Sequence, residues 1–169
     1  MAWRRPAPAR MNFVQAVQIL ADAGVDFVII GGWSAILHGS SYVTNDLDVC
    51  FSRGRENCQR LATALAPFHP RLRDIPKNVP FVWDEKSLRN GTIFTLSTDL
   101  GAIDLLAEVK GLGDFEDVKR NSVLVQAFDR DVWTLDLASL IQAKRAAGRE
   151  KDLRMVPELE SLLEASEPE

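Results

Sequence analysis

Residues 25–51, VDFVIIGGWSAILHGSSYVTNDLDVCF, set the order of secondary structure in this chain. Residues 25–30 are mostly β-branched and aromatic, which predicts a buried central strand. Two consecutive glycines end this strand, and the residues after them predict a short helix over 33–38. Residues 46–51 alternate acidic and apolar side chains, which predicts a second strand with one anionic face.

The flanking sequence continues this mixture of helices and strands. Asn12 is predicted to cap a first helix that ends at Gly24. Prolines divide residues 69–86 into loop and short strand pieces. The other predicted elements are a helix over 55–68, hairpins of strands 91–97 with 102–107 and 122–128 with 132–135, and two final helices over 137–147 and 150–163.

This order of elements predicts an α+β fold, with a mixed β-sheet flanked by helices and a C-terminal helical pair. With 169 residues the chain is long enough for one well-buried core and too short for two. The predicted organisation is a disordered basic arm over 1–11, a core over 12–136 and C-terminal helices over 137–164 that pack on the core.

Charge and cysteine content narrow the class of protein. A formal net charge of −4 argues against a general nucleic-acid coat, which would carry a basic face. The two cysteines, Cys50 and Cys58, predict reduced, partly buried thiols in a cytoplasmic protein. No apolar run approaches the ~20 residues that cross a bilayer, so no membrane contact is predicted.

The glycine turn, Gly31-Gly32, is the first candidate site. Glycines would let a phosphate approach the backbone, because no Cβ stands in the way. The helix that begins there presents unpaired N–H groups, and Ser34 adds a hydroxyl on its first turn. The alternative is that both glycines serve only the packing of the strand–helix junction.

Three aspartates form the second candidate site. Asp46 and Asp48 lie two residues apart on a predicted strand, so their side chains point to the same face. Two carboxylates ~4 Å apart repel by about 1 kcal/mol in water and more inside a protein, and a cation such as Mg²⁺ removes this cost. Asp104 is a single acid within an apolar strand, where an unpaired charge is costly. For each acid, the alternative is a strand face exposed to solvent.

Together these residues give a pattern, IGG at 30–32 followed by DLDV at 46–49. It resembles the hG[G/S]…DhDh signature of the DNA polymerase β-like nucleotidyltransferase superfamily, whose third acid lies on a later strand, as Asp104 does. The stretch 31–48 is similar to small bacterial nucleotidyltransferases, including AbiEii-type toxins, and to aminoglycoside and lincosamide nucleotidyltransferases. Many relatives carry an arginine where this chain has Tyr42, which can stack on a base or pack but cannot pair bidentately with phosphate.

The resemblance implies transfer of a nucleoside monophosphate from a nucleoside triphosphate to an acceptor hydroxyl, with Mg²⁺ or Mn²⁺ as cofactor. It implies that Asp46 and Asp48 hold the metal on the triphosphate. Asp104 would bind a second metal or deprotonate the acceptor, and the glycine turn with Ser34 would cradle the β- and γ-phosphates.

The resemblance extends to residues 140–153, where relatives show a similar Leu-Ile-x-x-Lys…Gly-Arg-x-Lys-Asp run. Lys144 lies on a predicted helix from which its ammonium can reach a bound triphosphate. Arg149, Lys151 and Asp152 either close the site or form an ion-pair network on a solvated helix, such as the pair of Arg149 with Asp152.

The acceptor is left open, with tRNA, a protein or a small molecule as candidates. Arg71 and Arg73 are candidates for the acceptor side of the cleft. A second hypothesis is a catalytically weak nucleotide sensor, or a toxin-like subunit that acts through an antitoxin partner protein. A third, a purely structural α+β domain, requires three acids to coincide with the glycine turn by chance.

Overall fold

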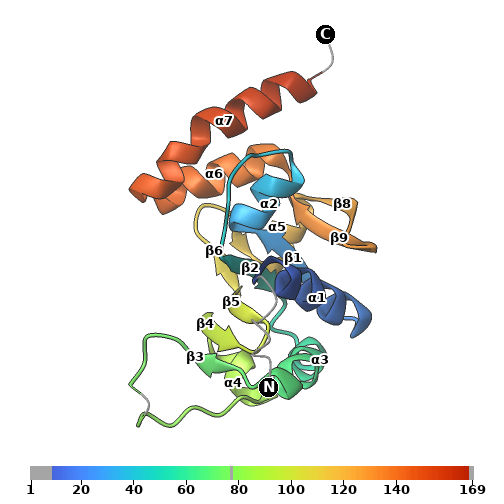
Figure 1. The fold of residues 1–169 in the computed structure, drawn as a ribbon, viewed down its shortest axis with the longest axis vertical. Helices are drawn as coiled ribbons and strands as arrows, with labels where there is room; N and C mark the ends of the chain where they lie inside the picture. Colours follow the sequence, from blue (N-terminus) through green and yellow to red (C-terminus); the bar gives the residue numbers. More distant parts are fainter. Residues whose placement is uncertain (1–8, 77, 168–169) are drawn as a thin grey trace, which may run out of the picture.

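The computed structural model of the chain describes residues 9–76 and 78–167 (Figure 1). The helices are α1 Ala9–Asp22, α2 Gly31–Leu37, α3 Arg55–Leu65, the 3₁₀ turn Ala66–Phe68, α4 Glu85–Asn90, α5 Phe115–Arg120, α6 Leu137–Ala147 and α7 Glu150–Ser166. The strands are β1 Phe27–Ile30, β2 Asp46–Phe51, β3 Arg71–Leu72, β4 Ile93–Thr98, β5 Gly101–Leu106, β6 Glu108–Val109, β7 Gly113–Asp114, β8 Ser122–Ala127 and β9 Arg130–Leu135.

Seven strands form one mixed sheet in the order β3-β4-β5-β2-β1-β9-β8. β2 lies at its centre, antiparallel to β1 and parallel to β5. α6 and α7 lie at one end of the molecule and α3 and α4 at the other (Figure 1). The predicted α+β fold with a mixed sheet flanked by helices is confirmed.

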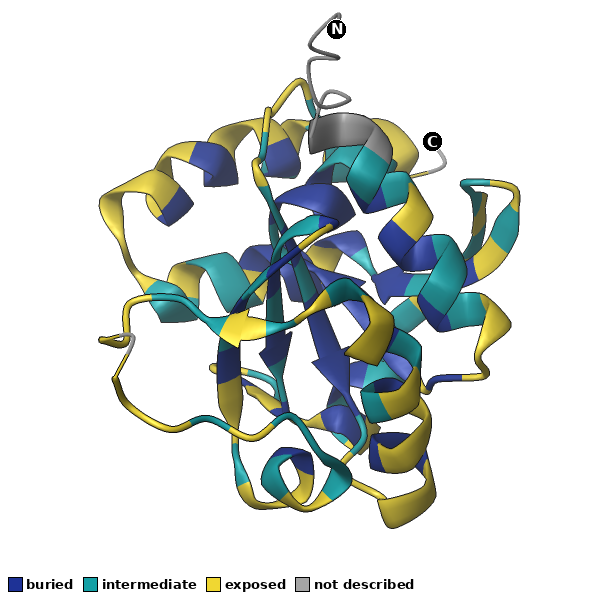
Figure 2. Cartoon of the chain, turned by 60° about the horizontal axis from the view of Figure 1, so that its bottom comes forward, coloured by how far each residue is buried: buried dark blue, intermediate teal, exposed yellow. Residues whose placement is uncertain are grey.

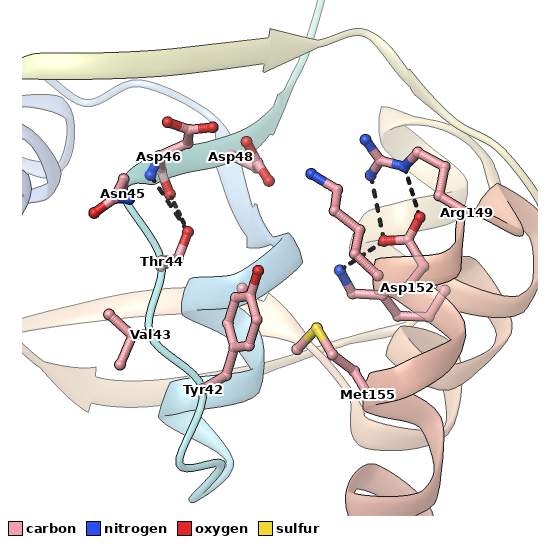
Figure 3. A pocket seen from close by; sticks show the side chains of 12 residues that line it. Tyr42, Val43, Thr44, Asn45, Asp46, Asp48, Arg149, Asp152 and Met155 are labelled. Atoms are coloured by element: carbon pink, nitrogen blue, oxygen red, sulfur yellow. Dashed lines mark hydrogen bonds and ion pairs between the residues drawn. The ribbon is translucent and has the colours of Figure 1, made fainter.

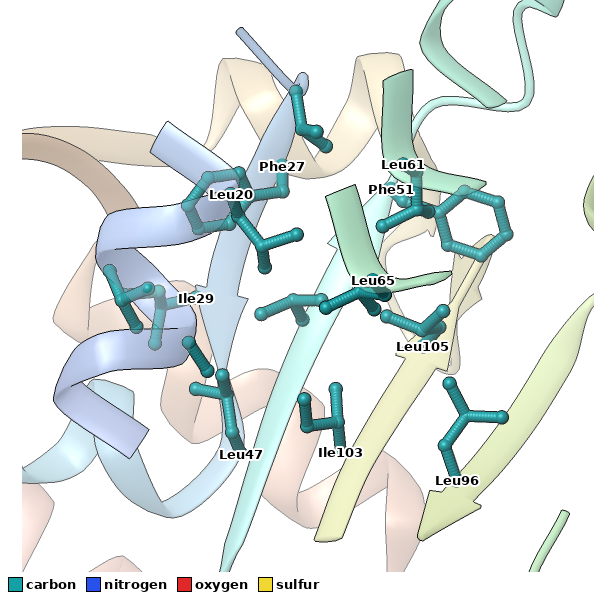
Figure 4. Packing of buried hydrophobic residues seen from close by; sticks show 14 of the residues in the cluster. Leu20, Phe27, Ile29, Leu47, Phe51, Leu61, Leu65, Leu96, Ile103 and Leu105 are labelled. Atoms are coloured by element: carbon teal, nitrogen blue, oxygen red, sulfur yellow. The ribbon is translucent and has the colours of Figure 1, made fainter. Parts of the chain in front are cut away.

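Each face of the sheet has its own hydrophobic cluster, because successive side chains of a strand alternate between faces. One cluster joins the sheet to α1 and α3 (Figure 4) and includes Leu20, Phe27, Ile29, Leu47, Phe51, Leu61, Ile103 and Leu105. The other joins the sheet to α5, α6 and α7 and includes Val28, Ile30, Cys50, Val118, Leu135, Leu140 and Leu159. Figure 2 shows the buried strands at the centre and exposed residues on the outer sides of the helices.

This alternation decides where the acids lie. Leu47 and Ile103 point into the α1–α3 cluster, so Asp48 and Asp104 point to the opposite face, toward α6 and α7. The predicted start of α6 at Leu137 agrees with the structure. Its predicted cap, Asp136, accepts a hydrogen bond from the Ser139 N–H at 2.7 Å.

Other boundaries differ from the predictions. α1 begins at Ala9, so Asn12 lies inside the helix and its predicted role as N-cap is wrong, since alanine and arginine at positions 9 and 10 favour helix. Of the predicted arm, residues 1–8 lie outside the described residues and 9–11 belong to α1. α7 continues to Ser166, beyond the predicted end.

The segment 69–86 contains the start of a helix that the sequence analysis did not predict. α4 begins after Asp84, whose carboxylate accepts a hydrogen bond from the Ser87 N–H at 2.8 Å. The helix is six residues long and follows a proline-rich stretch, so hydrophobic periodicity could not reveal it.

Two further findings concern cysteines and membranes. Cys50 and Cys58 are free thiols and both are buried, and burial raises the pKa of Cys50 to about 12. Within residues 9–76 and 78–167, no helix combines the length and the apolar character needed to cross a membrane.

Candidate functional site

The glycine turn lies directly against Asp48. Ile30 pairs with Asp48 across β1 and β2, so the residue after Ile30 comes close to the Asp48 side chain. Gly31 has a φ of +66°, and a Cβ on it would lie 2.3 Å from Oδ2 of Asp48. A Cβ on Gly32 would lie 2.9 Å from the Tyr42 ring. The glycines therefore allow the chain to pass a carboxylate and an aromatic ring that larger residues would displace.

The three predicted acids share one edge of the sheet face. The parallel register of β2 and β5 places Asp48 directly beside Asp104, and Asp46 beside Ala102. Neighbouring strands are about 4.8 Å apart, so the carboxylates of Asp48 and Asp104 are forced into proximity by backbone pairing alone. The predicted juxtaposition of Asp46 and Asp48 with a third acid from a later strand is what the register produces.

Burial and nearby negative charges change the acidity of Asp48. Burial, followed by the negative charges of Asp104 and Asp46, raises the pKa of Asp48 to about 7, although the positive charge of Lys144 acts in the opposite direction. An aspartate with this pKa is destabilised in its charged form, and a cation placed beside it would relieve the destabilisation.

The free energy of unfolding of the metal-free protein is expected to fall as pH rises from about 4 to about 7. An unfolded aspartate titrates near pH 4, whereas folded Asp48 titrates at about 7. Between these values the folded state holds the extra proton, so stability decreases with rising pH, by roughly 2–4 kcal/mol for this one group. Urea unfolding in EDTA across the window checks this expectation. Asp48→Asn should remove this part of the slope, and identical slopes for both proteins would contradict it.

Ser34 has a different setting from the one that phosphate binding requires. It is fully buried, and its Oγ accepts a hydrogen bond from the Thr134 hydroxyl at 2.6 Å. The Thr134 hydroxyl also lies 3.0 Å from the Ile29 carbonyl oxygen. Ser34 therefore ties α2 to β9 behind the glycine turn, and the structure gives it a packing contact rather than an open position.

A buried carboxylate holds two cations opposite the acids. Asp152 on α7 is 1% exposed. Its Oδ1 accepts a hydrogen bond from Lys144 Nζ at 3.2 Å, and its Oδ2 accepts one from Arg149 Nε at 2.7 Å. Burial raises the pKa of Asp152, but these hydrogen bonds outweigh burial and hold the pKa below its usual value. The predicted pair of Arg149 with Asp152 is present, but Asp152 is buried rather than solvated, and the network of Lys144, Arg149 and Asp152 lines a pocket.

Two pockets meet at Asp48 and Lys144. The polar pocket, about 260 Å³, lies between a wall with Tyr42 and Asp46 and a wall with Arg149 from the α6–α7 turn (Figure 3). The apolar pocket, about 240 Å³, lies on the side of Asp104, and its apolar lining comprises Ile93, Leu106, Val109, Leu135, Leu140 and Ala143 among others. One pocket is therefore suited to a charged group and the other to an apolar one.

Arg73 contacts the third acid, which the sequence analysis did not foresee. Its Nη2 donates to Oδ1 of Asp104 at 2.5 Å, and its Nη1 donates to the carbonyl oxygen of Leu96 at 2.5 Å. The two residues are 31 positions apart. No local pattern links them, since only the pairing of β3, β4 and β5 brings them together.

The oxygen atoms of the three aspartates are ligands of the kind that a hard divalent cation prefers. Asp46, Asp48 and Asp104 offer only carboxylate oxygens, the ligands that Mg²⁺ and Mn²⁺ prefer, and Asp104 already attracts the positive charge of Arg73. Within residues 9–76 and 78–167, however, no three His, Cys, Asp or Glu side chains lie close enough together to form a metal-binding group by themselves.

Two solved structures resemble this fold over most of the chain. The Thermotoga maritima protein TM1012, assigned as a nucleotidyltransferase, matches with a TM-score of 0.57 and 16% identity, over 88% of this chain and 92% of its own. The lincosamide antibiotic adenylyltransferase LnuA, solved with lincomycin bound, matches with a TM-score of 0.59 and 13% identity, over 90% and 96%. No family model and no curated protein sequence matches the chain.

These matches define the class of fold. The chain has the nucleotidyltransferase fold, as its glycine turn and acidic strand predicted. At 13–16% identity this likeness shows the architecture alone, because one fold can carry many different activities.

Proposed function

We propose that this protein transfers a nucleoside monophosphate from a nucleoside triphosphate to an acceptor hydroxyl, with Mg²⁺ as cofactor. The observation that carries the proposal is the opposition of charges across the polar pocket. Asp46 and Asp48 lie on one wall, and Lys144, Arg149 and Lys151 lie on the other. A metal-bound triphosphate carries both kinds of charge and would satisfy both walls at once.

The chain's own groups have distinct roles in this proposal. Asp46, Asp48 and Asp104 would hold Mg²⁺, which supplies charge stabilisation at the phosphates when bound. Lys144 and Arg149 would donate hydrogen bonds to phosphate oxygens, with Asp152 holding both in place. The apolar pocket beside Asp104 would receive an apolar part of a substrate.

The reaction exchanges one phosphorus–oxygen bond for another. The acceptor oxygen forms a bond to the α-phosphorus, and the bond from that phosphorus to pyrophosphate breaks. The acceptor proton needs a base, and the carboxylate of Asp104, which lines the apolar pocket, is the candidate for that role. Pyrophosphate leaves toward the cationic wall.

A transfer assay tests the proposal. The protein is incubated with each of the four α-labelled nucleoside triphosphates and with total tRNA, lysate protein, aminoglycosides or lincosamides. Lincosamides belong in the panel because the similar enzyme LnuA was solved with lincomycin. We expect one acceptor class to become labelled, and EDTA to prevent labelling.

Calorimetry with each nucleotide separates this proposal from its competitors. Nucleotide binding without transfer to any acceptor would favour a nucleotide sensor. Absence of both binding and transfer would contradict the proposal. The toxin-like role and its antitoxin partner remain predictions from the sequence, as does the use of tRNA as acceptor.

A further inference from the structure

Arg73 is held firmly at the edge of the acidic cluster. Its guanidinium bridges the Asp104 carboxylate and the Leu96 carbonyl oxygen, both at 2.5 Å. Its backbone N–H donates to the carbonyl oxygen of Thr95 at 2.8 Å. The ion pair is mostly shielded from solvent, since the side chains of Arg73 and Asp104 are 25% and 20% exposed. Arg73 is therefore held by β4 at its backbone, and by β4 and β5 together at its guanidinium.

The guanidinium of Arg73 lies beside a carboxylate that has another acid, Asp48, as its neighbour. Asp104 lies beside Asp48 in the sheet, and their charges repel. On the other flank of this pair, Lys144 offsets the charge of Asp48. Arg73 thus supplies on the Asp104 side the positive charge that Lys144 supplies on the Asp48 side.

We propose that Arg73 is a resident counter-ion of Asp104 that a divalent cation must displace. The inference rests on the proposed function in one respect, that Asp104 is a metal ligand. In the metal-free protein the guanidinium stabilises the packed acids. Once a metal approaches, the same positive charge repels it, and the hydrogen bond holds an Asp104 oxygen away from it. Arg73 is a positioning residue that lowers the affinity of the site for the metal.

If Arg73 competes with the metal for Asp104, then replacing Arg73 should strengthen metal binding rather than weaken it. Arg73→Gln should bind metal more tightly than the wild type, because it removes the competitor and keeps Asp104. A charge-assisted hydrogen bond of this kind accounts for about a tenfold change in affinity or more. A residue that merely supported the fold would weaken metal binding when replaced.

Manganese binding, measured by electron paramagnetic resonance without nucleotide, provides the test. The matched control is Arg71→Gln, because Arg71 lies on β3 two positions away, is exposed, and loses the same charge. We expect the Kd for Mn²⁺ to fall about tenfold or more in Arg73→Gln, and to change less than about threefold in Arg71→Gln, whose charge is screened by solvent.

A second pair of variants ties the effect to Asp104. On an Asp104→Asn background, adding Arg73→Gln should change the Kd no more than Arg71→Gln does, since the contested carboxylate is gone. Thermal unfolding of each variant shows whether it is folded at the temperature of the binding measurement.

Each outcome has a defined meaning. Equal effects of Arg73→Gln and Arg71→Gln, or weaker binding in Arg73→Gln while it remains folded, would overturn the inference and leave the proposed function standing. A gain that persists with Asp104→Asn would also overturn it. Absence of Mn²⁺ binding in every variant would overturn the inference together with the metal dependence of the proposed function.

Discussion

Replacing Asp48 with asparagine is expected to reduce nucleotidyl transfer, measured as kcat/KM, by at least about a thousandfold. The physical reason is that Asp48 lies close to the negative charges of Asp46 and Asp104 and lines both pockets together with Lys144. Loss of a ligand for a catalytic metal removes several kcal/mol of transition-state stabilisation, and each ~1.4 kcal/mol is tenfold in rate.

The same substitution should leave the fold intact or make it more stable. An amide cannot carry the charge that burial and the neighbouring acids disfavour, so the unfolding free energy above pH 7 should be equal or higher. Asp131→Asn is the matched control, because Asp131 is an exposed strand aspartate on β9. Transfer at wild-type rate in Asp48→Asn, with the control also active, would refute the assignment of Asp48.

Replacing Asp152 with alanine is expected to have the largest effect on stability, about 3–5 kcal/mol of unfolding free energy. Asp152 is almost completely buried and neutralises two cations, Lys144 and Arg149. Its removal leaves the Lys144 ammonium, which is only 12% exposed, without its partner. Urea unfolding measures the loss.

Glu150→Ala is the matched control for this experiment. Glu150 lies in the same first turn of α7 and also forms an ion pair, with Arg154, but both side chains are exposed. Solvent screening limits such a pair, so the control should lose less than about 1 kcal/mol. Losses of equal size in the two variants would show that Asp152 is not a buried anchor.

The folded fraction of the Asp152→Ala protein should also bind nucleotide more weakly than the wild type does. Lys144 and Arg149 would no longer be held over the polar pocket, so the Kd for a nucleoside triphosphate should rise about tenfold or more. Calorimetry at a temperature well below unfolding separates this effect from the loss of stability.

Local patterns in the sequence were sufficient for the central elements. The alternation of acidic and apolar residues in 46–51 predicted β2 with its true bounds and placed Asp46 and Asp48 on one face. The glycine turn predicted the abrupt junction of β1 and α2. The apolar surroundings of Asp104 singled it out, the resemblance assigned it to the same site, and the strand register places it beside Asp48.

Other features depend on contacts between distant segments. Ser34 fitted the local pattern of a phosphate-binding turn, yet its hydroxyl accepts a hydrogen bond from Thr134, a residue 100 positions away. The hydrogen bond from Lys144 to Asp152 joins two helices, α6 and α7. Residue spacing within either helix does not predict the angle between them. Arg73 reaches Asp104 only because β3 and β5 both flank β4.

The sequence alone therefore determined which strands carry the acids and which face they share, because side-chain alternation along a strand is a local property with a period of two. Tertiary structure decided which cations neutralise those acids. An ion pair between distant residues depends on where two separate backbones bring their side chains. The neighbouring residues of Arg73 therefore do not reveal its contact with Asp104, and those of Lys144 do not reveal its contact with Asp152.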